Sequence, residues 1–196
     1  MRAESEQLKK YLPRVGTKTK DRLKWVLQKV TDYRRDGGAD WSPGDWENAC
    51  LEIAVFTGIE NLPGHGGIPI TDGKIDRPSQ NEAKAILITF QGMIEDALHH
   101  KSITLGEFHT KREIFWSQQA GRYFLWEDIE DATWEAKARY AMALLLKEDG
   151  HRLQRCPAKL AHSGKSCRKP FLKAKRKKYC GPKCASREMT RKFREK

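Results

Sequence analysis

The C-terminal segment of this 196-residue chain holds four of its five cysteines, and their spacing limits how the segment can fold. Ten, twelve and three residues separate them, at Cys156, Cys167, Cys180 and Cys184. Four thiolates suit a tetrahedral Zn²⁺, and so short a segment cannot bury an adequate core without a metal or a disulfide. The spacing therefore predicts one structural Zn²⁺ per chain, with these four cysteines as its ligands.

Two alternatives for these ligands remain open in the sequence. His162 lies between the first two cysteines and can replace Cys156 or Cys167 as a ligand. The other alternative is four thiols without a metal in a basic tail. In a reducing compartment, clustered cysteines bind metal more often than they form disulfides. The fifth cysteine, Cys50, is expected to be an ordinary core residue on an apolar helix face.

Charge divides the chain into two parts. Residues 151–196 carry 17 Lys and Arg against two acids, whereas residues 1–150 carry 21 Lys and Arg against 24 acids. A strongly basic segment joined to a slightly acidic body indicates a polyanionic partner, usually nucleic acid. The alternative is a basic extension that only improves solubility or lies near a ribosome.

The basic segment is expected to contain a helix that begins near Gly181-Pro182, with Cys184 in its first turn. Its basic face is predicted from helical periodicity to contain Lys183, Arg187, Arg191 and Arg194. A second face, with Ala185, Met189 and Phe193, is expected to pack on the zinc core. Arg side chains on such a helix can read guanine edges, and both Lys and Arg can contact phosphates.

The connector before this helix adds a run of cations that we expect to contact phosphates. These cations are Lys173, Lys175, Arg176, Lys177 and Lys178.

The remainder of the chain predicts a mainly α protein, with a helical N-terminal domain followed by a small zinc-stapled module. We expect a flexible N-terminus over 1–18, a helical domain over 19–150 and a basic zinc-finger module over 151–196. Apolar periodicity, caps and glycine stops predict the helices of the domain. They are expected at 20–38, 42–58, 79–98, 105–119 and 131–148.

Two segments of this domain have strand character. IPITDGKID is expected to form a small hairpin that turns at Asp72-Gly73. GRYFLW, over 121–126, is ambiguous between a short strand and the entry to a helix.

The segment RLQRCPAKLAHSGKSCRKPFLKAKRKKYCGPKCASR resembles the CGNR zinc-finger family. That family combines a Cys pair, a basic-aromatic connector of the FLxxxxRRxYC kind and a second Cys pair followed by Gly-Asn-Arg. Here Ala185-Ser186-Arg187 follows Cys184, so only the Arg of that triplet is retained. The N-terminal two-thirds resembles the ABATE domain of the same family in its helix layout and its WSPGDW stretch.

The resemblance implies a structural zinc, DNA binding and a role as a stress-linked bacterial transcription regulator. We expect a binding protein and not an enzyme, with double-stranded DNA as the partner. We expect a cytoplasmic, nucleoid-associated protein, because the sequence has no secretory h-region and no apolar run of the ~18 residues that a membrane span needs. The helical body is then the part that could serve for homodimer contacts or for a small-molecule effector.

Two other functions compete with this interpretation. A zinc nuclease needs an open metal position and nearby acids, but four cysteines fill the shell and the basic module contains no Asp. An RNA- or ribosome-binding adaptor would use aromatic stacking platforms. The module offers only Phe171, Tyr179 and Phe193, and some of these must fill its core.

Overall fold

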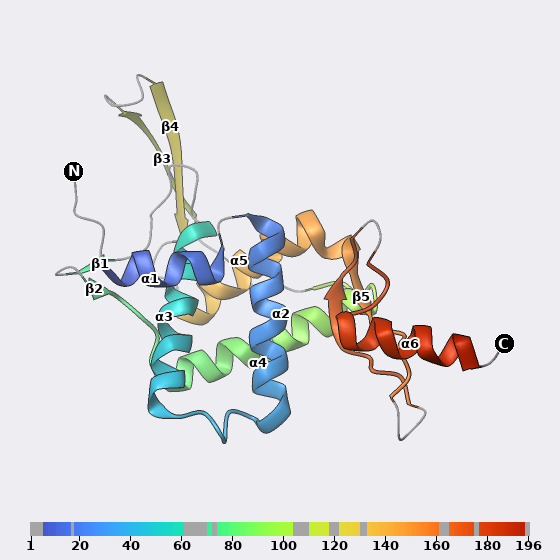
Figure 1. Cartoon of the computed structure of the whole chain (residues 1–196). Coiled ribbons are helices and arrows are strands. Elements are labelled where there is room, and N and C mark those ends of the chain that lie inside the picture. The colour runs from blue at the N-terminus through green and yellow to red at the C-terminus, as the bar shows by residue number, and fades with distance from the viewer. Residues whose placement is uncertain are drawn as a thin grey trace.

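The computed structural model describes residues 6–16, 18–60, 70–71, 74–103, 110–117, 122–129, 133–160, 165–174 and 177–194. It is mainly helical, as predicted (Figure 1). It ends in a small module that contains the four cysteines. The helices of the body are α1 (Glu6–Val15), α2 (Thr19–Asp36), α3 (Pro43–Glu60), α4 (Gln80–Leu98) and α5 (Trp134–Asp149). The C-terminal module contains a 3-10 turn (Gly150–Arg152), β5 (Leu153–Arg155), β6 (Pro170–Leu172) and α6 (Pro182–Arg194).

The body is built around α3, which is buried on more than one face. Cys50 is buried on an apolar face, as expected from the sequence, but Leu51, Ala54 and Val55 are buried as well. Helices α1, α4 and α5 all contact α3, and α2 contacts α4 and α5. A helix covered by neighbours on several sides has no single apolar stripe, so periodicity alone does not identify all of its buried residues.

The predicted helix starts at two serines are confirmed. Ser79 and Glu82 form a reciprocal capping box at the start of α4. At α3, the backbone N–H of Ser42 donates to Asp45 while the N–H of Asp45 donates to the Ser42 hydroxyl. Both pairs satisfy backbone donors that the first turn of a helix otherwise leaves unpaired.

Part of the N-terminus that was expected to be flexible is helical. Helix α1 buries Tyr11 and Val15 against the body, and the Tyr11 hydroxyl donates to Asn48 Oδ1 at 2.7 Å. Pro13 lies inside this helix. Packing against α3 therefore outweighs the local cost of a proline in so short a helix.

The helix predicted at 105–119 is wrong over the residues that the structure describes. Residues Thr110–Ser117 form β3, which pairs antiparallel with β4 (Arg122–Ile129) and opposes Ile114 to Leu125. The start of the predicted helix, residues 105–109, lies outside the described residues. Both strands are rich in aromatic and β-branched residues, which favour a pleated ribbon over a helix. The ambiguous 121–126 segment is accordingly part of a strand over its described residues.

The small hairpin predicted after α3 is confirmed in its pairing. β1 (Ile70–Thr71) pairs antiparallel with β2 (Lys74–Ile75). Its turn residues, Asp72 and Gly73, lie outside the described residues.

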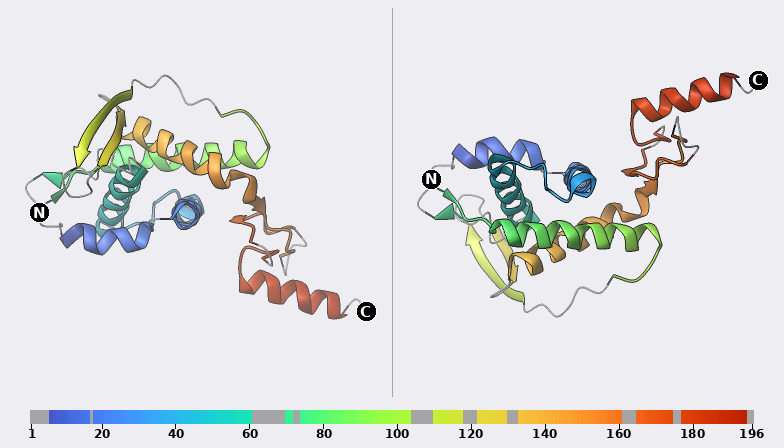
Figure 2. Two further views of the ribbon diagram at one scale, coloured as in Figure 1. Left: turned by 90° about the horizontal axis from the view of Figure 1, so that it is seen from above. Right: turned by 90° about the horizontal axis from the view of Figure 1, so that it is seen from below.

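The C-terminal module, which we call the finger (residues 150–194), is joined to the body by more than a linker. β5 pairs antiparallel with β6, with Leu153 opposite Leu172, and both leucines belong to the hydrophobic core of the body. β5 contacts α4 and β6 contacts α2. Helix α6 points away from the body, with the C-terminus at its far end (Figure 2). A cut at residue 150 would therefore remove two side chains from the body's core.

None of the helices in the described part of the chain is both long enough and apolar enough to cross a membrane.

Candidate functional site

The four predicted cysteines lie together in the finger. The sulfur atoms of Cys156, Cys167, Cys180 and Cys184 are all within 4.8 Å of one another. The Sγ of Cys180 lies 3.9 Å from that of Cys167 and 3.5 Å from that of Cys184. None of them is in a disulfide.

These distances suit a single metal ion. Four sulfurs at ~2.3 Å from a central Zn²⁺ are spaced by about 3.8 Å from one another, close to the separations seen here. Soft thiolate donors in a tetrahedral set select zinc or iron–sulfur chemistry over Mg²⁺ or Ca²⁺. The geometry therefore supports the predicted ligand set as a metal-binding group. His162, the alternative ligand, lies outside the described residues.

A hairpin explains how ligands ten residues apart come together. The N–H of Cys156 donates to Lys169 O at 3.0 Å, and the N–H of Cys167 donates to Ala158 O at 2.7 Å. These bonds continue the β5–β6 pairing, so the described residues that follow Cys156 and those that precede Cys167 run side by side. The two cysteines are therefore neighbours, although ten residues separate them in the sequence.

The other two ligands come from the start of α6. Cys180 precedes the helix and Cys184 lies in its first turn, as predicted. The cluster therefore fixes α6 to the hairpin at one point, close to the N-terminal end of the helix.

Burial and hydrogen bonding give the thiols unequal acidities. Burial raises the pKa of Cys180, and the neighbouring Cys184 and Cys156 thiols raise it further. Burial is also the main reason that the pKa of Cys184 is raised. At Cys156 burial acts in the same direction, but the pKa is lowered because backbone groups of Cys180 and Ala158 hydrogen-bond to it. A metal must therefore displace protons when it binds this cluster.

The apolar part of the finger differs from the prediction. Phe171 and Ala158 are buried with the cysteines, and Tyr179 packs against them. Met189 and Phe193, which were expected to pack on the zinc core, are 71% and 83% exposed. The side of α6 that faces the cluster carries Cys184 and Glu188 instead.

Glu188 is a residue whose role the sequence did not indicate. It is 5% exposed and accepts a hydrogen bond from the backbone N–H of Lys159 at 2.7 Å. It also pairs with Arg191 at 3.0 Å. These two contacts lower the pKa of Glu188, the Lys159 bond being the larger cause. The burial of Glu188 could have been predicted from its position four residues after Cys184, because residues four apart lie on the same face of a helix.

The predicted basic face of α6 is only partly free. Arg191 is half-buried in its pair with Glu188, and Arg187 is half-buried with its Nη1 donating to Lys159 O at 3.4 Å. Lys183 and Arg194 are exposed. We call the outward side of the helix the exposed face of α6, and it consists of Lys183, Ser186, Met189, Thr190, Phe193 and Arg194.

The predicted phosphate-contacting connector is also at the surface where it is described. Lys173, Lys177 and Lys178 are exposed, and the Lys177 ammonium lies 5.6 Å from the centroid of the Phe171 ring. Lys175 and Arg176 lie outside the described residues.

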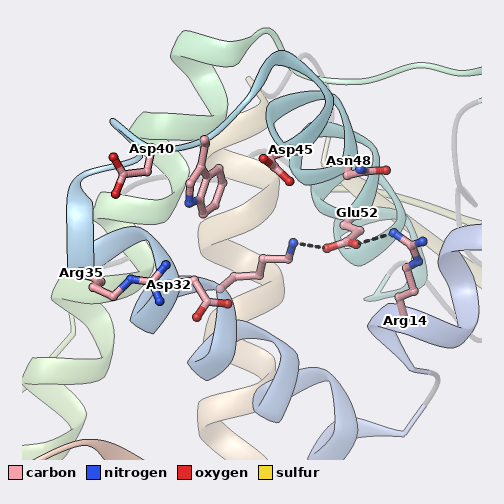
Figure 3. Close-up of a pocket in the computed structure, with 9 residues that line it drawn as sticks. Arg14, Asp32, Arg35, Asp40, Asp45, Asn48 and Glu52 are labelled. Atoms are coloured by element: carbon pink, nitrogen blue, oxygen red, sulfur yellow. Dashed lines mark hydrogen bonds and ion pairs between the residues drawn. The ribbon is translucent and has the colours of Figure 1, made fainter.

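A second candidate site is a cavity of about 370 Å³ in the body, among α1, α2 and α3 (Figure 3). Glu52 is one of its lining residues, and its side chain is 5% exposed and pairs with Lys29 at 2.6 Å and Arg14 at 3.5 Å. Trp25 Nε1 donates to the same carboxylate at 3.0 Å. Because these donors already satisfy Glu52, the network serves to hold the three helices together. The cysteine cluster remains the better candidate for function.

Comparison of the chain with protein-family models, with curated proteins and with solved structures found no match. The resemblance to the CGNR family therefore stays a prediction. The finger is therefore the part of the molecule from which we infer a function.

Proposed function

We propose that the protein is a DNA-binding transcription regulator whose finger is held by one structural Zn²⁺ and places α6 on double-stranded DNA. The observation that carries this proposal is the convergence of four sulfurs at the start of α6, a helix that projects from the body with a basic, exposed face. Zinc coordinated by Cys156, Cys167, Cys180 and Cys184 would close its tetrahedral shell and act as a structural staple. The resemblance to the CGNR family points to the same function.

The exposed face of α6 has the composition of a helix that enters the major groove. Lys183 and Arg194 lie on it and can meet phosphates or guanine edges. Met189 and Phe193 extend into solvent between them, and apolar side chains in the groove contact thymine methyl groups. Large apolar side chains that are this exposed beside cations favour a bound surface over a merely solvated helix.

The finger's architecture favours binding over catalysis and duplex over single-strand recognition. Four thiolates leave a tetrahedral metal no open position for an activated water. Of the three aromatic residues considered as stacking platforms for RNA, Phe171 is buried and Tyr179 packs in the finger core. The helical body is then the regulatory or interaction domain.

Fluorescence anisotropy of the zinc-loaded full chain with labelled duplex DNA, in a series of salt concentrations, tests this proposal. The double variant Lys183→Gln/Arg194→Gln should bind more weakly. Its plot of log K against log[salt] should be shallower by about 1.8, since each phosphate contact contributes ~0.9.

The matched control is Lys18→Gln/Lys20→Gln, which removes the same charge from two exposed lysines at the start of α2. It should leave affinity and slope unchanged. If both double variants lose the same DNA affinity, binding depends on the overall charge of the protein and not on α6. Tighter binding of single-stranded RNA than of duplex DNA would favour the adaptor function.

A further inference from the structure

A second basic surface lies where the body meets the finger. A cavity of about 420 Å³ opens between α2 and the strands of the finger, next to the ligand Cys167. Four cations line it: Arg34 from α2 and Arg155, Arg168 and Lys169 from the finger. No Asp or Glu is among the described residues that line it. The cavity is therefore a place where the body could share a ligand with the finger.

The charge at this cavity is only partly neutralised. Glu95 of α4 pairs with Arg34 at 3.0 Å through one carboxylate oxygen and with Arg155 through the other. One carboxylate thus serves two guanidiniums, and Arg168 and Lys169 add two further cations. The surplus of positive charge suits an anion.

Two of these four cations, Arg34 and Arg155, are held in position before any ligand arrives. Glu95 fixes both guanidinium groups, while the Arg34 side chain remains 51% exposed. Arg168 follows Cys167 directly, has a left-handed backbone with φ of 52°, and donates its N–H to Cys156 O at 3.1 Å. The hairpin that carries Cys156 and Cys167 therefore fixes the backbone of Arg168. Such preorganisation lowers the entropic cost of binding.

We infer that this junction cavity binds a phosphate group of the DNA backbone, so that the body contributes Arg34 directly to the nucleic-acid interface. Guanidinium groups hold phosphate oxygens through paired hydrogen bonds, and this geometry favours Arg over Lys at such sites. The inference rests on the proposed DNA binding of the finger. The inference goes beyond the proposed function because the body, whose net charge is slightly negative, becomes part of the DNA-contacting surface.

The test compares two neighbouring arginines of α2 in the zinc-loaded full chain. Arg34 lines the junction cavity, whereas Arg35 lines the cavity around Glu52. We expect Arg34→Gln to weaken binding to labelled duplex DNA and to reduce the salt slope by about 0.9, the contribution of one phosphate. Arg35→Gln, with the same loss of charge, should match the wild type. Arg34→Lys should restore the slope but only part of the affinity.

A variant on the finger side guards against a folding defect in α2. Arg168→Gln should reproduce the loss seen with Arg34→Gln, and its thermal melt should overlay that of the wild type. Arg34→Gln loses one ion pair with Glu95, so its melting temperature should fall only slightly. Inorganic phosphate, added as a competitor at constant ionic strength, should weaken DNA binding by the wild type more than by Arg34→Gln. If the wild type binds DNA and Arg34→Gln has the same salt slope as the wild type, this inference is overturned but the proposed function is not. A wild type that does not bind DNA would overturn the proposed function and this inference with it.

Discussion

The carboxylate of Glu188 on α6 accepts a hydrogen bond from the backbone N–H of Lys159 at 2.7 Å. This contact joins the helix to the cysteine hairpin at a second point, one turn beyond Cys184. The same carboxylate pairs with Arg191, so it also orients a cation that the sequence had suggested for DNA. The orientation of α6 on the finger is therefore set by the cysteine cluster and by one buried acid together.

Substitution of Glu188 tests this second attachment. Glu188→Gln keeps an acceptor for Lys159 but loses the charge opposite Arg191, whereas Glu188→Ala loses both contacts. We expect stability of the finger to fall from wild type to Gln and further to Ala, because a backbone N–H is left unpaired in the last case. Amide hydrogen exchange of Lys159 and α6 in the zinc-loaded protein measures the order. An Ala variant that exchanges like the wild type would mean that the cysteine cluster alone orients the helix.

The cysteine cluster should bind one zinc per chain. Elemental analysis of the purified protein gives the stoichiometry, and chelation should unfold the finger because the apparent free energy of zinc binding in such modules is ~10–16 kcal/mol at neutral pH. Cys180→Ser and Cys184→Ser should each abolish stable binding. Circular dichroism before and after chelation should show loss of α6 helicity with most of the body's signal retained. A finger whose fold resists strong chelators would exclude a structural metal.

Two phenylalanines of the finger should behave in opposite ways. Phe171 is 4% exposed and Phe193 is 83% exposed. Phe171→Ala should cost about 3–5 kcal/mol, enough to unfold the finger, because it empties the small core beside the cysteines. Phe193→Ala should change the free energy of unfolding by less than about 0.5 kcal/mol, as expected for a surface residue. Phe193→Ala should nevertheless weaken DNA binding, which fluorescence anisotropy would measure. A large loss of stability in Phe193→Ala would mean that Phe193 packs in the core of the finger.

Consecutive glycines after α2 offer a matched pair in the body. Gly37 and Gly38 both have left-handed backbones, with φ of 62° and 76°. A Cβ at Gly37 would meet nothing within 4 Å, whereas a Cβ at Gly38 would lie 2.5 Å from the Trp46 ring. Trp46 is itself packed against Trp41 and Tyr33, so it cannot easily move.

Gly37→Ala should therefore lower the free energy of unfolding by about 1–2 kcal/mol, because alanine is strained in a left-handed backbone conformation. Gly38→Ala should cost about 1–3 kcal/mol more through overpacking. Urea unfolding of the two variants measures the difference. Equal losses would show that the Trp46 ring gives way.

The junction between body and finger should be sensitive to acid through Glu95. Burial opposes ionisation of Glu95, but hydrogen bonds from Arg155 and Arg34 outweigh it and lower its pKa. A lowered pKa means that the stabilisation is present above the unfolded value of ~4.3 and is lost as the pH falls through the folded value. His99 also faces this group, with its Nε2 at 3.2 Å from Arg155.

Glu95→Gln should therefore be less stable than the wild type by about 1 kcal/mol near pH 7, as for a partly exposed ion pair. The difference should shrink towards zero below about pH 4. Urea unfolding of both proteins between pH 3 and pH 7 measures it. Both carry the same cysteines, so loss of metal at low pH affects them alike, and a difference that stays constant with pH would contradict the assignment to Glu95.

Features that depend on local chemistry could be predicted from the sequence. Ser42 and Ser79 determined the starts of α3 and α4, because a cap needs only a residue three positions away in the chain. The four clustered cysteines and the concentration of positive charge around them likewise followed from residue type and spacing. The helix start expected near Gly181-Pro182 placed Cys184 in the first turn of α6.

Features that depend on distant partners were decided by the tertiary structure. Periodicity gave the faces of α6, but only the hairpin around Lys159 determined that Glu188 would be buried and Phe193 exposed. Likewise β3 formed with its partner strand where local capping signals had suggested a helix. The meeting of Arg34 with Arg155 depends on Glu95 of α4, far from both in sequence. Burial and pairing are properties of surfaces that fold together, and the local pattern of a segment does not specify which other segment will cover it.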